Sequence, residues 1–251
     1  MKMANKILSL WGTPRSRSTA FMWMMKNRGD FVAFFEPFAR SAYYSEERIF
    51  TLEEEVQLNP EYNYQVVLEE LVSTAKKSQV FVKDFPRHFF HRADKQFLSF
   101  FQHTFLIRDP AQMLPSYLHK WPNLTFEETG YRQLYELFDK VASYVGQIPP
   151  LIDADDLVNQ PESTVRAYCN SVGILFIPDA LRWEPPQEKV KKMSWWDGGS
   201  WHDSMSVTRT FCEQVNSHYL TIDESDRLKS YYELCLPYYE KLHSYRLRVD
   251  A

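Results

Sequence analysis

Residues 8–21 read LSLWGTPRSRSTAF, and this stretch is the strongest indication of the fold. An apolar run typical of a buried strand ends at Gly12, a short turn follows, and a helical pattern begins near Ser18. In such a unit the backbone N–H groups of the turn and the positive end of the helix dipole face one spot, which suits an anion. The loop adds two guanidinium and three hydroxyl groups, from Arg15, Arg17, Ser16, Ser18 and Thr19. The sequence therefore predicts an anion site.

This loop differs from the phosphate loop of nucleotide triphosphatases, which follows the pattern G-x-x-x-x-G-K-[ST]. Gly12 and Thr19 fit that spacing, but Arg17 takes the place of the second glycine and Ser18 that of the lysine. A triphosphatase needs the lysine for the β- and γ-phosphates and normally a magnesium ion. We therefore expect a phosphate-like ligand rather than ATP hydrolysis. The alternative is a basic turn that only caps a helix.

A second string, TFLIRDPAQMLPSY at residues 104–117, repeats this design at another strand end. Asp109 can cap a helix whose first residue is Pro110, because proline is favoured at that position. Arg108 lies at the tip of the strand, and Ser116 lies two helical turns along on the Asp109 face. The sequence predicts a second anion contact here, with a structural ion pair of Arg108 as the alternative.

Together the two strings resemble the two nucleotide-binding motifs of sulfotransferases, a 5′-phosphosulfate loop after the first strand and an R-x₇-S motif for the 3′-phosphate. The resemblance implies that the 3′-phosphate is held by Arg108 and Ser116, which have that spacing. It implies that the 5′-phosphosulfate is held by Arg15, Ser16, Arg17, Ser18 and Thr19. Residues 151–176, LIDADDLVNQPESTVRAYCNSVGILF, are also similar to a sulfotransferase segment that reads roughly y-E-D-L, P-e, helix, L-G.

The resemblance implies an enzyme that moves the sulfuryl group of 3′-phosphoadenylyl sulfate to a small-molecule acceptor, leaving adenosine 3′,5′-bisphosphate and requiring no metal. One position departs from the pattern of many animal enzymes, since Arg15 stands where they carry lysine. Bacterial small-molecule members often read P-R-S-x-S-T, so the chain resembles that group, whose short soluble members often modify secondary metabolites, toxins included. Whether an oxygen or a nitrogen is sulfated stays open.

The order of the elements predicts an α/β fold with a parallel central sheet of about five strands flanked by helices, like that of P-loop kinases. The strands are expected at residues 6–11, 31–35, 79–83, 104–107 and 151–153. Helices are expected at residues 18–27, 64–77, 93–101, 110–120, 126–145, 161–172 and 224–245. Ligands of such sheets bind at the carboxyl ends of the strands.

Residues 183–205, WEPPQEKVKKMSWWDGGSWHDSM, form a long segment without a clear period, which is typical of a lid or binding loop. We expect Trp201 and His202 to contact the nucleotide, with Trp195 and Trp196 able to close over the adenine or the acceptor. Gly198 and Gly199 would supply a hinge for this segment. A basic segment that closes over the nucleotide could include Lys189, Lys191 and Lys192. The whole chain, residues 1–251, is predicted to be a single domain.

Sulfuryl transfer needs cations near the leaving phosphate and a group that takes the acceptor's proton. Arg15 and Lys83 are the candidate cations. His88 is the first candidate base, because histidine titrates near neutrality and this one follows a strand end. Glu36, at the tip of the second strand in FFEPF, is the next candidate, and Asp84 is the third. His88 and His91 are spaced as metal ligands can be, but no carboxylate–histidine set completes a site, so no metal is predicted.

The composition narrows the class of protein. Hydrophobic residues make up 44% and charged residues 25%, as in ordinary soluble proteins. The net charge of −4 makes a nucleic-acid partner unexpected. The three cysteines have no C-x-x-C spacing, which fits a reducing cytosol. The first residues suit neither a signal peptide nor a membrane span, so a cytoplasmic protein without membrane contact is expected.

Two other functions fit parts of the sequence. A nucleotide or small-molecule kinase shares the sheet topology, and Asp109 could then be a metal ligand. A non-catalytic nucleotide-binding module would keep the anion motifs but lack a base. Comparing the binding of adenosine 3′,5′-bisphosphate with that of ATP and magnesium distinguishes a sulfotransferase from a kinase. An assay with labelled donor distinguishes an enzyme from a non-catalytic module.

Overall fold

A computed structural model describes residues 6–52, 55–184, 208–212 and 219–249, and these residues contain a five-stranded parallel sheet. The strands are β1 (Ile7–Gly12), β2 (Val32–Phe35), β3 (Val80–Asp84), β4 (Phe101–Ile107) and β5 (Leu151–Asp153). Their spatial order is β2-β3-β1-β4-β5, so the strands that precede the two predicted anion motifs, β1 and β4, are neighbours. The predicted α/β fold with about five parallel strands is confirmed.

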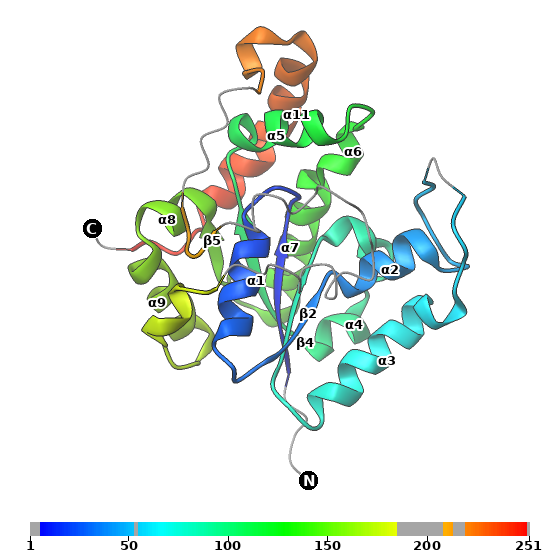
Figure 1. Ribbon diagram of the computed structural model, residues 1–251, viewed down its shortest axis with the longest axis vertical. Coiled ribbons are helices and arrows are strands. Elements are labelled where there is room, and N and C mark those ends of the chain that lie inside the picture. Colours follow the sequence, from blue (N-terminus) through cyan, green and yellow to red (C-terminus); the bar gives the residue numbers. More distant parts are fainter. Residues whose placement is uncertain (1–5, 53–54, 185–207, 213–218, 250–251) are drawn as a thin grey trace.

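Helices cover both faces of this sheet (Figure 1). On one side lie α1 (Ser18–Asn27), α8 (Ala154–Asn159) and α9 (Pro161–Val172). The other side holds α2 (Pro37–Tyr44), α3 (Tyr64–Ala75), α4 (Lys95–Phe100) and α7 (Tyr131–Val145). The remaining helices are α5 (Pro110–Lys120), α6 (Phe126–Thr129) and α11 (Asp226–His243), with α5 packed against α11.

The alternation of side chains along β1 explains the two layers. Ile7 and Trp11 point into the core beneath α3, α4 and α7, whereas Leu8 and Leu10 point into the core beneath α1 and α9. All six residues of the strand are buried, because a parallel sheet with helices on both faces leaves neither face to water. The core fixes the strand ends, and these carry the site.

Two parts of the predicted element list were wrong. The helix expected at residues 126–145 is divided into α6 and α7 by Gly130, whose positive φ of 79° glycine adopts without a Cβ penalty. The helix expected at residues 93–101 ends at Phe100, and β4 begins at Phe101, earlier than residue 104. Helices α2 and α8 were not predicted.

No helix in the described part of the chain is long and apolar enough to cross a membrane. The predicted lid at residues 183–205 lies outside the described residues from residue 185 onward, and with it lie Trp201 and His202. The prediction of one domain stays a prediction.

Candidate active site

The residues after the carboxyl ends of four neighbouring strands line one pocket of about 590 Å³. Gly12 of β1 pairs with Leu106 of β4, so the loop after β1 lies beside Arg108. Phe35 of β2 pairs with Lys83 of β3. The pocket therefore has two sides, which we call the β1–β4 side and the β2–β3 side.

The loop after β1 turns tightly on Gly12. A Cβ atom there would lie 3.1 Å from the Ser16 Oγ and 3.2 Å from the carbonyl oxygen of Leu106, closer than most real contacts. The Ser16 hydroxyl donates a 2.6 Å hydrogen bond to the Thr13 carbonyl, so it closes the turn. Ser16 has no exposed surface, and we expect its backbone N–H, rather than its hydroxyl, to face a ligand. Ser18 and Thr19, at the start of α1, line the pocket.

Three non-glycine residues in the described part of the chain have a left-handed backbone, and all three line the pocket. They are Arg15 (φ 60°), Arg17 (φ 64°) and Glu36 (φ 46°). This conformation is costly for residues with a Cβ and is concentrated at functional sites. Here the guanidinium-bearing residues Arg15 and Arg17 follow β1, the carboxylate-bearing Glu36 follows β2, and all three contribute to the pocket wall.

Direct hydrogen bonds join the two predicted anion motifs. Arg108 donates from Nη1 to the carbonyl oxygen of Arg15, at 2.9 Å. Arg15 donates from Nε to the hydroxyl of Ser116, at 3.0 Å. Asp109 accepts a hydrogen bond from the backbone N–H of Ala111 and caps α5, as the sequence predicted. The loop after β1 and the start of α5 thus form a single cradle.

This cradle holds excess positive charge. Burial, followed by the neighbouring Arg17, lowers the pKa of Arg108 to about 10. Burial also lowers the pKa of Arg15. Among the described residues Arg108 forms no ion pair, since its side chain bonds only to the Arg15 carbonyl and to Gln112. A half-buried arginine without an ion pair, as Arg108 is among the described residues, favours an anionic ligand.

Glu36 and Lys83 form an ion pair on the β2–β3 side, and both line the pocket. The backbone N–H of Glu36 donates to the Lys83 carbonyl at 2.7 Å, which fixes the start of α2 against β3. The Lys83 ammonium lies 3.8 Å from the ring centre of Phe85 and 4.7 Å from that of Phe35. Burial lowers the pKa of Lys83, and the Glu36 carboxylate opposes this shift.

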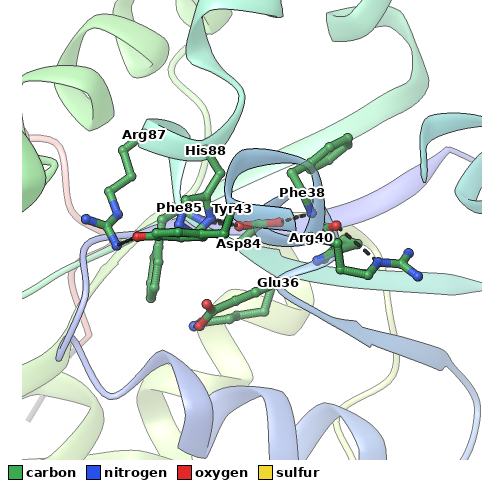
Figure 2. Close-up of polar contacts among 10 residues, drawn as sticks. Glu36, Phe38, Arg40, Tyr43, Asp84, Phe85, Arg87 and His88 are labelled. Carbon is green, nitrogen blue, oxygen red and sulfur yellow. Dashed lines mark hydrogen bonds and ion pairs between the residues drawn. The ribbon is translucent and has the colours of Figure 1, made fainter. Parts of the chain in front are cut away.

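Asp84 and His88, which the sequence offered as alternative bases, form a buried dyad (Figure 2). The His88 Nδ1 lies 2.7 Å from the Asp84 Oδ1. The same carboxylate accepts 2.7 Å hydrogen bonds from the backbone N–H groups of Phe38 and Phe85, which fix its orientation. In this arrangement Asp84 holds the proton of His88 on Nδ1 and leaves Nε2 as an acceptor.

The electrostatics of the dyad suit a neutral imidazole. Burial, and then the charge of Arg87, lowers the pKa of His88 well below its usual value. Burial raises the pKa of Asp84 to about 7, although its two backbone hydrogen bonds oppose the shift. The Nε2 of His88 is buried, finds no partner among the described residues, and belongs to a side chain that lines the pocket. His88 is therefore neutral at neutral pH and can accept a hydrogen bond at Nε2, but it does not titrate near neutrality as the sequence analysis expected.

The rest of the β2–β3 side comes from residues that the sequence analysis missed. Tyr43 and Phe85 line the pocket, and their rings lie 5.7 and 5.6 Å from the His88 ring, with Phe50 packed behind at 6.3 Å. The wall of the pocket also includes Tyr44, Leu52, Arg87, Tyr117 and Trp121. Helix spacing from Glu36 gave no signal for Tyr43, because Glu36 precedes α2 and has a left-handed backbone.

A family profile described as a sulfotransferase domain matches residues 5–245. The chain belongs to the sulfotransferase family. This confirms the resemblance seen in the two anion motifs and makes the pocket the candidate active site of a sulfotransferase.

Two Arabidopsis thaliana proteins, named branched-chain-amino-acid aminotransferase-like proteins 2 and 1, are 28% and 27% identical to this sulfotransferase over 194 residues. The alignments cover 76% of the chain and 34% and 35% of the relatives, so the chain spans about a third of their length.

Two solved structures are also similar. The sulfotransferase domain of the curacin biosynthetic pathway is 15% identical over 97% of this chain and 99% of its own, with a TM-score of 0.46. The sulfotransferase domain of the Synechococcus PCC 7002 olefin synthase is 12% identical over 93% and 96%, with a TM-score of 0.49.

Proposed function

We propose that this sulfotransferase moves the sulfuryl group of 3′-phosphoadenylyl sulfate to a hydroxyl or amine of a small-molecule acceptor. The observation that carries the proposal is the cradle in which Arg15, Arg17 and Arg108 line one pocket while Arg108 has no carboxylate partner among the described residues. A donor with a phosphate at each end of its ribose brings negative charge to both motifs of this cradle.

The proposed roles follow the two motifs. Arg108 and Ser116 would hold the 3′-phosphate. The backbone N–H groups of the loop after β1 would hold the 5′-phosphosulfate, together with Arg15, Arg17, Ser18 and Thr19. Arg15 donates to the Ser116 hydroxyl in the structure. When the donor binds, Arg15 would exchange this hydrogen bond for one to the leaving 5′-phosphate.

The chemistry of the step balances without a further reactant. The acceptor oxygen or nitrogen forms a bond to sulfur, and the bond from sulfur to the 5′-phosphate oxygen breaks. The acceptor proton passes to His88 Nε2, which Asp84 orients through Nδ1, and negative charge develops on the leaving phosphate. Arg15 and Lys83, which both line the pocket, would stabilise that charge. Glu36 is the rival base, although its ion pair with Lys83 occupies it.

Binding experiments test the proposal against a kinase. Adenosine 3′,5′-bisphosphate should bind in competition with the donor, and ATP with magnesium should bind far more weakly, because the loop lacks the lysine that cradles β- and γ-phosphates. Tight ATP binding with magnesium would favour the kinase instead. Mass-spectrometric transfer of labelled sulfuryl groups to an acceptor library distinguishes an enzyme from a non-catalytic nucleotide-binding module.

Turnover should be unchanged in EDTA, because arginine and lysine side chains supply the positive charge that Mg²⁺ supplies in kinases. The measurement is the rate of adenosine 3′,5′-bisphosphate formation with excess EDTA, which removes divalent ions. Loss of activity that magnesium restores would contradict it.

Turnover should fall as the pH drops below about 7, the pKa to which burial raises Asp84. A protonated Asp84 can donate its O–H to His88 Nδ1, so the imidazole loses its fixed tautomer. His88 itself stays neutral because its pKa lies well below the usual value. We expect turnover at pH 6 to be about tenfold below its plateau. Asp84→Asn should lower the plateau and remove this limb. If turnover of Asp84→Asn still falls below about pH 7, a group other than Asp84 causes the pH dependence.

A further inference from the structure

Arg87 is a cation on the β2–β3 side that the proposed transfer does not use. It lies next to His88 in a short 3₁₀ helix, η2 (Pro86–His88), and lines the same pocket. Its Nη2 donates a 2.7 Å hydrogen bond to the Tyr43 hydroxyl, as Figure 2 shows, and its Nη1 donates a 3.2 Å bond to the Glu128 carbonyl. Its guanidinium lies 5.2 Å from the ring centre of Phe50. The group is therefore held in one orientation.

No carboxylate forms an ion pair with this guanidinium among the described residues. Burial lowers the pKa of Arg87, but Tyr117, Tyr43, Glu128 and Glu36 together outweigh burial and raise it. Both of its hydrogen-bond partners are uncharged, and they use two of the five N–H groups of an arginine. Its Nε is buried and has no acceptor in the described part of the chain. A structural role for Arg87 accounts for the two bonds but leaves Nε and the other N–H groups without an acceptor among the described residues.

The carboxylates nearby are engaged elsewhere. Glu36 pairs with Lys83, and Asp84 holds His88. The Glu128 side chain accepts from the N–H and hydroxyl of Thr125 at 2.8 and 2.9 Å, at the capping box of α6. An internal ion pair that would make Arg87 purely structural is therefore missing from the described residues.

We infer that the acceptor of this sulfotransferase carries a carboxylate that binds Arg87, and that this contact sets the acceptor's nucleophile near His88. The inference rests on the proposed function and names the class of its acceptor. A planar, preoriented guanidinium matches a carboxylate through paired hydrogen bonds. Glu36 and Lys83 on this side offset each other's charge, so among the described residues Arg87 supplies a single positive charge outside an ion pair, which suits a monoanion. The aromatic wall around it suits an apolar body, so a hydroxy or amino acid with an aromatic or aliphatic body fits best.

Matched acids and amides test the inference without turnover. The probes are the three hydroxybenzoates and 3-(4-hydroxyphenyl)propionate, each beside its neutral amide, titrated by calorimetry onto protein saturated with adenosine 3′,5′-bisphosphate. In the natural protein at least one acid should bind about tenfold or more tightly than its amide. Arg87→Gln should bring each acid and its amide to similar affinities. Equal binding of every pair to the natural protein, or a preference that Arg87→Gln retains, would overturn the inference.

Two further variants separate a lost contact from a lost fold. Arg87→Lys keeps the charge but not the planar group, so part of the preference should remain. Arg92→Gln is the matched control, because Arg92 is exposed and pairs with Glu47 at 3.5 Å, and the preference should be unchanged there. Affinity for adenosine 3′,5′-bisphosphate should be equal in all of these proteins. If the natural protein prefers acids but binds no adenosine 3′,5′-bisphosphate, the proposed sulfuryl transfer would be rejected. The contact between Arg87 and a carboxylate would still be supported.

Discussion

Replacing Arg108 with alanine should weaken the binding of adenosine 3′,5′-bisphosphate by about 10- to 150-fold. A hydrogen bond to a charged group contributes roughly 1.5–3 kcal/mol to the free energy of binding. Losing that free energy raises the dissociation constant by the stated factor. The expected loss is large because Arg108 is half-buried and forms no ion pair with a carboxylate among the described residues. Calorimetric titration of the natural protein and the variant measures it.

A ligand without a 3′-phosphate is the control for Arg108→Ala. Adenosine 5′-phosphosulfate should bind the natural protein and the variant with nearly equal affinity, because it has nothing for Arg108 to hold. This control also reports on the loop after β1, since Arg108 donates to the Arg15 carbonyl. Equal losses for the two ligands would mean that the variant has disturbed the loop, and they would contradict a contact between Arg108 and the 3′-phosphate.

The sequence predicted best the elements whose ends carry a physical marker. The expected bounds of α1 and α5 agree with the structure. Gly12 allows the tight turn before α1, and Asp109 with Pro110 forms a cap that suits only a helix start. The pairing of β1 with β4, which the sequence analysis did not predict, brings the two motifs together.

Helix α2 shows what local patterns could not supply. It has only eight residues and begins after Glu36, a non-glycine residue with a left-handed backbone that no sequence rule anticipates. Tertiary packing holds it, since Phe38 is fully buried and its N–H donates to Asp84. Missing α2 meant missing Tyr43 and so the partner of Arg87.

The dyad shows a different limit. Asp84 and His88 were identified as competing candidates, whereas the structure makes one the partner of the other. Their spacing of four residues was a usable signal, but in irregular chain it does not bring two side chains together as it does in an α-helix. The contact depends on η2 turning His88 back toward the end of β3.

Replacing His88 with alanine should lower turnover by about 10²-fold or more while affinity for adenosine 3′,5′-bisphosphate stays nearly the same, as removal of a general base should. The reason is geometric: Asp84 fixes Nδ1, and Nε2 has no partner among the described residues in a side chain that lines the pocket. The unchanged nucleotide affinity also serves as the check that this buried substitution has left the fold intact. Turnover is measured with labelled donor and the best acceptor from the library.

Glu36→Gln is the control for His88→Ala, because it removes the competing carboxylate with little change in volume. It also leaves Lys83 without its ion-pair partner, so a modest loss from altered charge at the leaving phosphate is expected. A nearly silent His88→Ala with a large loss in Glu36→Gln would place the base on β2 and reduce the dyad to a structural contact. If both variants are nearly silent, no base limits the step, and the acceptor arrives already nucleophilic, as a neutral amine does. That result would direct the search from hydroxy acids to amino acids, because Arg87 would still require the carboxylate.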